Sequence, residues 1–80
     1  MTPAEPPGAR YVLSVGPADV GGRVVVRHAL REGGLSDLLG ELVRWDDEVA
    51  VRDRSGLVHA VPRTAVVAAK RVPPPPVRRA

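Results

Sequence analysis

The sequence contains no cysteine and no phenylalanine, and its aromatic side chains are one tyrosine and one tryptophan. Without cysteine the chain has neither disulfides nor thiolate ligands for zinc, so its stability must come from packing. The shortage of aromatic rings also counts against two functions. Domains that bind proline-rich peptides or single-stranded nucleic acid usually line their binding surfaces with several such rings.

No apolar run in the 80 residues approaches the ~20 residues that a membrane-spanning helix needs. The N-terminus also lacks the basic start of a secretory signal, so we expect a cytoplasmic protein with no membrane partner. A chain this short forms at most one small core, which buries about 60% of the surface that the unfolded chain exposes. We therefore expect a single domain of marginal stability.

The charge balance is only weakly basic. The formal net charge is +3, from 12 basic and 9 acidic residues, and every basic residue except Lys70 is an arginine. The acidic residues are interspersed among the basic ones, which is more typical of a solvated surface than of one that binds a phosphate backbone. The charge therefore gives little support to a nucleic-acid partner.

Valine-rich segments of alternating polarity fill the middle of the chain and end at the proline run that begins with Pro73. The alternation is clearest over residues 23–31, where one face carries apolar side chains and His28 while the other is rich in arginine. We expect further strands over residues 38–46, 48–54, 57–61 and 66–72, with Val49 and Val51 directed inward in the third. Gly40 marks a bulge or sharp bend in the second strand, and residues 62–65 have the right length for one turn of 3-10 helix.

Five short antiparallel strands with a 3-10 turn before the last predict an all-β, SH3-like barrel over residues 20–72. Such closure leaves few open sheet edges. An OB-like barrel is the alternative, although it usually has a longer helix between its strands, and the sequence indicates none. We interpret residues 1–19 as a disordered or irregular leader, in which 11–15 can add an edge strand, and residues 73–80 as a flexible proline- and arginine-rich linker or tail.

Three segments carry a family resemblance: GRVVVR at 22–27, DLLGELV at 37–43 and VPRTAVVAAK at 61–70. With Val72 and the prolines after it, they resemble the N-terminal SH3-like domain that precedes the catalytic domain in a group of actinobacterial GNAT-type N-acetyltransferases. The resemblance implies an accessory module whose protein partner is an acetyltransferase domain. Because the sequence ends at Ala80, where such enzymes continue into the catalytic domain, the resemblance implies no catalytic residue here.

The reactive side chains form no catalytic or cofactor pattern. Gly33 and Gly34 are the candidate for a coenzyme-binding turn, but a strand follows where a helix would be needed to bind the pyrophosphate of acetyl-coenzyme A. His28 and His59 lack further metal ligands at useful spacing, and the acidic run 46–48 is typical of a solvated turn. We therefore expect neither an enzyme nor a bound cofactor or metal.

Two groups of residues are candidates for binding a partner. Trp45, at the end of the second expected strand, is either a partly buried cap on the core or an exposed anchor for a protein partner. The second group consists of arginines on the outer face of the first strand and at the end of the third, and it raises the alternative of a small nucleic-acid-binding barrel. These arginines are Arg23, Arg27, Arg31, Arg52 and Arg54.

Overall fold

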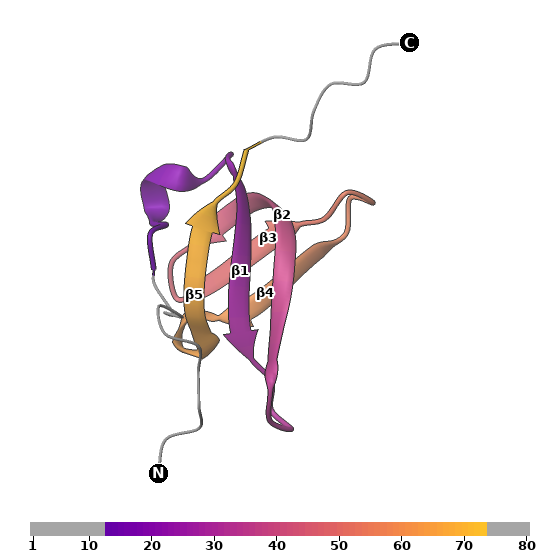
Figure 1. The fold of residues 1–80 in the computed structure, drawn as a ribbon. Helices are drawn as coiled ribbons and strands as arrows, with labels where there is room; N and C mark the ends of the chain where they lie inside the picture. Colours follow the sequence, from indigo (N-terminus) through magenta and orange to yellow (C-terminus); the bar gives the residue numbers. More distant parts are fainter. Residues whose placement is uncertain (1–12, 74–80) are drawn as a thin grey trace.

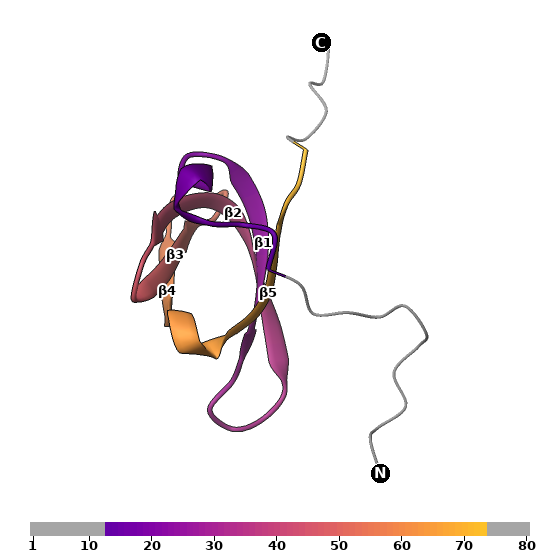
Figure 2. The ribbon, with the colours of Figure 1, turned by 90° about the vertical axis from the view of Figure 1, so that its left-hand side faces the viewer.

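The computed structural model describes residues 13–73, so residues 1–12 of the predicted leader and residues 74–80 of the predicted linker or tail lie outside the described residues. Five antiparallel strands form one sheet in the order β4-β3-β2-β1-β5. The sheet curls into a small barrel, with β1 and β5 on one side and β3 and β4 on the other (Figure 1; Figure 2). The elements are η1 (Pro17–Asp19), β1 (Arg23–Ala29), β2 (Leu35–Trp45), β3 (Glu48–Arg52), β4 (Val58–Pro62), η2 (Arg63–Ala65) and β5 (Val66–Arg71).

This architecture confirms the predicted all-β barrel of five strands. The one-turn helix expected before the last strand is η2, which connects β4 to β5. Within residues 13–73 both helical elements are single 3-10 turns of three residues. The longer helix of an OB-like barrel is therefore not found between the strands of this domain.

Strand β2 carries the sheet from one side of the barrel to the other, and Gly40 makes the bend possible. The first half of β2 pairs with β1, and its second half pairs with β3. A Cβ atom on Gly40 would overlap the carbonyl oxygen of Arg52 on β3, so only glycine allows the two backbones to approach this closely. The close approach at Gly40 agrees with the predicted sharp bend, but there is no bulge at this residue: β2 pairs with β1 through Gly40 without a register shift, and its irregularity lies between Leu42 and Arg44.

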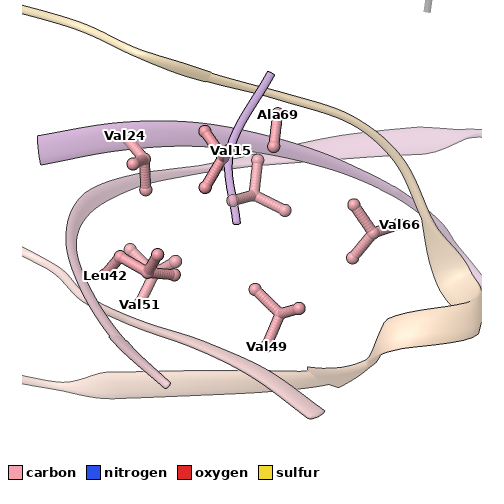
Figure 3. Close-up of a cluster of buried hydrophobic side chains, with 8 residues drawn as sticks. Val15, Val24, Leu42, Val49, Val51, Val66 and Ala69 are labelled. Atoms are coloured by element: carbon pink, nitrogen blue, oxygen red, sulfur yellow. The ribbon is translucent and has the colours of Figure 1, made fainter. Parts of the chain in front are cut away.

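Aliphatic side chains, most of them valine, fill the inside of the barrel (Figure 3). Burial alternates along β1 as predicted from the sequence, with His28 on the buried face, and Val49 and Val51 of β3 are buried as predicted. Partly buried hydrophobic residues from β2 and β4 pack at the margin of the core. The fully buried side chains are Val24, Val26, Leu42, Val49 and Val51.

Residues 13–19, which the sequence assigns to the leader, pack against the barrel. Leu13 forms an isolated parallel bridge with Ala69 of β5, and the backbone N–H of Ser14 donates to the Ala69 carbonyl oxygen at 2.9 Å. Val15, only 7% exposed, belongs to the core. The segment therefore contributes both to the edge of β5 and to the interior.

One carboxylate, that of Asp19, joins the turn η1 to the end of β5. Asp19 accepts a hydrogen bond from the Gly16 N–H at 2.8 Å and another from the Arg71 guanidinium at 2.9 Å. These two hydrogen bonds hold the pKa of Asp19 below its ordinary value. Asp19 therefore links the chain before β1 to its last strand.

Several strand boundaries differ from the prediction by one to three residues, and β3 ends at Arg52, so that Arg54 lies in the turn after it. Strand β2 begins at Leu35 instead of Leu38, because residues 35–37 also pair with β1 in the sheet. An ion pair between Asp37 and Arg27, directly opposite on β1, stabilises this extension. Strand β1 ends at Ala29 instead of Arg31.

Candidate functional site: an arginine-lined groove

A shallow groove of about 910 Å³ opens on the outer surface of the barrel, next to the bend of β2. The groove is large enough to receive a ligand or a short peptide segment. Its walls come from β1, β2, β3 and the turn that leads to β4, together with the backbone at Gly40. The side chains that line it are Arg23, Leu39, Glu41, Arg52, Asp53 and Arg54.

Three charged side chains form a row across the groove. Arg23, Glu41 and Arg52 are direct cross-strand neighbours on β1, β2 and β3. Residues opposite one another in antiparallel strands point to the same face, so their charges lie side by side. The Glu41 carboxylate accepts a hydrogen bond from Arg52 Nη1 at 3.0 Å. One carboxylate therefore stands between two arginines, and the row keeps an excess positive charge.

Arg23 and Arg54 are the arginines of the groove that are not paired with a carboxylate of the described residues. Neither side chain forms an ion pair or hydrogen bond with any residue of 13–73. The Nε atom of Arg23 is moreover buried with no hydrogen-bond partner there, and an unsatisfied buried donor costs about 1–3 kcal/mol. Arg54 is exposed in the turn after β3.

The second carboxylate of the groove, that of Asp53, accepts hydrogen bonds from the turn in which it lies and from the strand that follows. Its Oδ1 accepts hydrogen bonds from the Ser55 hydroxyl at 2.6 Å, the Ser55 N–H at 2.8 Å and the Leu57 N–H at 3.1 Å. Its Oδ2 lies 2.8 Å from His59 Nε2. Hydrogen bonds from Ser55, and next from His59, hold the pKa of Asp53 well below its ordinary value of 3.8. Asp53 therefore stays ionised and fixes the rim of the groove.

The structure separates the remaining arginines predicted as site residues from this groove. Arg27 forms a bidentate ion pair with Asp37, at 2.9 and 3.2 Å, and this pair lowers the pKa of Asp37. Arg31 is exposed beyond the end of β1, at the opposite end of that strand from Arg23. Sequence reasoning named Arg23, Arg52 and Arg54 but could not show that the bend at Gly40 brings them together.

Trp45 lies at the end of β2, outside the groove. It is partly buried, packs against the core cluster, and has the Arg63 guanidinium carbon 5.1 Å from its ring centroid. Such a cation–π contact contributes about 0.5–1 kcal/mol at an exposed site. The contact joins the end of β2 to η2.

The sequence also raises the questions of a metal site, a coenzyme-binding turn at Gly33 and Gly34, and the acidic run 46–48. Residues 13–73 contain no group of three or more acidic or histidine side chains arranged to hold a metal ion. Gly33 and Gly34, both with positive φ, lead directly into β2 and not into a helix. Asp46, in the acidic run, accepts hydrogen bonds from Arg44 and from the Glu48 N–H. The part of the chain described also has no helix of the length and apolarity that a bilayer crossing requires.

Comparison with known proteins places this fold in a family. A family model described as the Rv0428c N-terminal Sm-like domain matches residues 18–70. The match contains strands β1 to β4, most of β5 and every side chain that lines the groove. Searches of curated proteins and of solved structures found no significant match. Because the family model covers more than half of its length, this chain belongs to the family of the Rv0428c N-terminal Sm-like domain.

Proposed function

We propose that this Sm-like domain is a non-catalytic interaction module that works beside a GNAT-type N-acetyltransferase domain in the actinobacterial cytoplasm. The sequence resemblance to the accessory domains of such enzymes supports the association. Membership of the Sm-like family supports the identification of the chain as a small β module. The partner domain packs against the outer face of β1 and β2.

The outer face of β1 and β2 is the observation that carries this proposal. Leu35 and Leu39 are 42% and 49% exposed there, on either side of Asp37. Asp37 in turn is paired with Arg27. A face that combines exposed leucines with charges paired within the domain suits a protein partner. A phosphate backbone would instead have to compete with the domain's own carboxylates for its arginines.

The unpaired Arg23 and Arg54 favour a second candidate function, nucleic-acid binding. The composition of the groove opposes it, because Glu41 and Asp53 would repel phosphates and no aromatic side chain lines the groove for a base to stack on. Titration with a mixed-sequence oligonucleotide at about 50 mM salt distinguishes the two functions. Salt-sensitive binding would support this candidate, and no binding would remove it.

Calorimetric titration of the chain with a separately purified GNAT-type acetyltransferase domain from the same genome tests the proposal. We expect saturable binding that Leu39→Glu removes, because the substitution places a charge on the docking face. Leu57→Glu is the matched control, since Leu57 is 60% exposed in the turn between β3 and β4. Absence of binding by the unaltered chain, or turnover of acetyl-coenzyme A by the chain alone, would overturn the proposal.

A further inference from the structure

We infer that the groove beside the bend of β2 binds a carboxylate-bearing, acidic segment of the partner protein through Arg23, Arg52 and Arg54. This inference rests on the proposed function and deepens it, because it names the chemistry that the partner presents. A folded acetyltransferase domain can offer such a segment as a loop or a chain end.

The charges that line the groove are complementary to an acidic ligand. Three arginines and two carboxylates line the groove. Asp53 is engaged by Ser55, Leu57 and His59, and Glu41 is engaged by Arg52. The two carboxylates therefore leave Arg23 and Arg54 with no acidic partner within residues 13–73. A carboxylate from outside the domain supplies the charge that the domain itself lacks.

The Arg23 side chain also has a hydrogen-bond donor that lacks an acceptor. Its Nε is buried and has no acceptor within the described fold. A guanidinium group presents Nε and Nη as a fork that fits the two oxygens of a carboxylate. When the Arg23 side chain turns toward an incoming carboxylate, the Nε–H gains the acceptor that it lacks. Binding thus relieves a defect of the free domain as well as adding a contact.

The walls of the groove combine apolar and charged side chains. Leu39, 49% exposed, provides an apolar contact among the charges of the groove. Glu41 and Asp53 tolerate a ligand that carries a few separated carboxylates between apolar side chains. A phosphate backbone gains little from Leu39, and no aromatic side chain lines the groove for a base to stack on. An acidic peptide segment therefore fits this groove better than a nucleic acid does.

The backbone of the groove is already in place before any ligand arrives. The close approach of Gly40 to the Arg52 carbonyl fixes the strands that carry the row, and Asp53 fixes the turn that carries Arg54. Binding therefore orders side chains but not the main chain, which reduces its entropic cost.

NMR titration of the ¹⁵N-labelled full chain tests the inference. The probe is a blocked pentapeptide of alternating glutamate and leucine, and the comparison peptide has glutamine in place of glutamate. We expect the acidic probe to shift the backbone amides of residues 21–23, 39–41 and 52–54, and the glutamine peptide to leave them unshifted. Arg23→Gln and Arg54→Gln should each weaken binding about fivefold to tenfold.

Arg31→Gln is the matched control, because it removes the same charge from an exposed arginine outside the groove. It should leave the affinity within about twofold, since a lone surface charge contributes little. Equal weakening by all three variants, or shifts spread over the whole surface, would overturn the inference by showing only nonspecific charge attraction. Tighter binding of a ten-nucleotide thymidylate to the same amides would overturn it in favour of nucleic acid.

The acetyltransferase domain separates failure of this inference from failure of the proposed function. If Arg23→Gln and Arg54→Gln bind that domain as well as the unaltered chain does, the groove is not the docking site, although the association stands. If the unaltered chain does not bind that domain but binds the acidic probe through the groove, the association fails and the chemistry of the groove stands.

Discussion

The N–H and the hydroxyl group of Ser14 both donate hydrogen bonds to the carbonyl oxygen of Ala69, at 2.9 and 3.1 Å. This contact attaches the chain before η1 to the outer side of β5, and so covers part of what would otherwise be an open sheet edge. The next residue, Val15, enters the core. The structural domain therefore includes residues that precede its first predicted strand.

Val15→Ala tests this contribution of the segment before η1. We expect a loss of about 1–2 kcal/mol in the free energy of unfolding, because the substitution removes two buried methyl groups and leaves a cavity. Val20→Ala is the control, since Val20 is 49% exposed, and it should change stability by less than about 0.5 kcal/mol. Urea denaturation measures the free energy of unfolding of both variants. If Val15→Ala is as stable as the unaltered chain, the segment before η1 does not support the core.

Gly40→Ala tests the bend of β2. A Cβ atom there overlaps the Arg52 carbonyl oxygen, so we expect a loss of about 3 kcal/mol or more, enough to unfold much of a marginally stable domain. Gly16→Ala serves as the control, because no atom lies within 4 Å of a Cβ placed there. Circular dichroism should show loss of strand structure in the first variant alone. A folded Gly40→Ala variant of unchanged melting temperature would contradict this account of the bend.

Trp45→Ala distinguishes the two interpretations of Trp45. Its packing against the core and its contact with Arg63 predict a loss of about 2 kcal/mol, from buried area and the cation–π contact together. Arg63→Gln should cost less stability, because it removes only the cation–π contact and leaves the buried area of Trp45 in place. Thermal denaturation measures both variants. If Trp45→Ala keeps its melting temperature but loses affinity for the acetyltransferase domain, the side chain acts as an anchor for the partner instead.

The stability of the domain should decrease in acid, and Asp53 should account for part of the decrease. Because the pKa of Asp53 is lower in the folded chain than its ordinary value of 3.8, its contribution is present above that value and is lost as the pH falls toward the folded pKa. We expect the melting temperature to drop between about pH 5 and pH 2, and to drop less in Asp53→Asn. Asp53→Asn should also be less stable than the unaltered chain at neutral pH.

Asp47→Asn is the control for this pH experiment. The side chain of Asp47 is exposed and forms no hydrogen bond with other residues of 13–73. Its variant should therefore reproduce the melting curve of the unaltered chain at each pH. If acid lowers the melting temperature of Asp53→Asn as much as that of the unaltered chain, other carboxylates cause the acid sensitivity.

Local patterns were sufficient to predict the strands of this barrel. Along β1 the alternation of Val24, Val26 and His28 with outward side chains identifies the buried face, because one face meets the core and the other meets solvent. Gly40 was predictable as a bend because glycine in a strand often marks close approach of another backbone. These features depend only on neighbouring residues in the sequence.

Features that depend on distant contacts could not be predicted in this way. Strand β2 extends to Leu35 because Asp37 pairs with Arg27 on another strand, although Ser36 and Asp37 alone indicate a turn. The groove depends in the same way on the register that places Arg23, Glu41 and Arg52 in one row. Composition reveals the arginines but not which of them lie side by side on the sheet.

The same glycine that lets β2 cross between the two sides of the barrel also lies in the wall of the groove. Evolution therefore has little freedom at that position, since any larger residue would damage the scaffold before it altered recognition. The rim positions 23 and 54 are different, because neither side chain belongs to the core cluster. Exchange of those two residues should therefore alter the charge of the groove while the barrel remains intact.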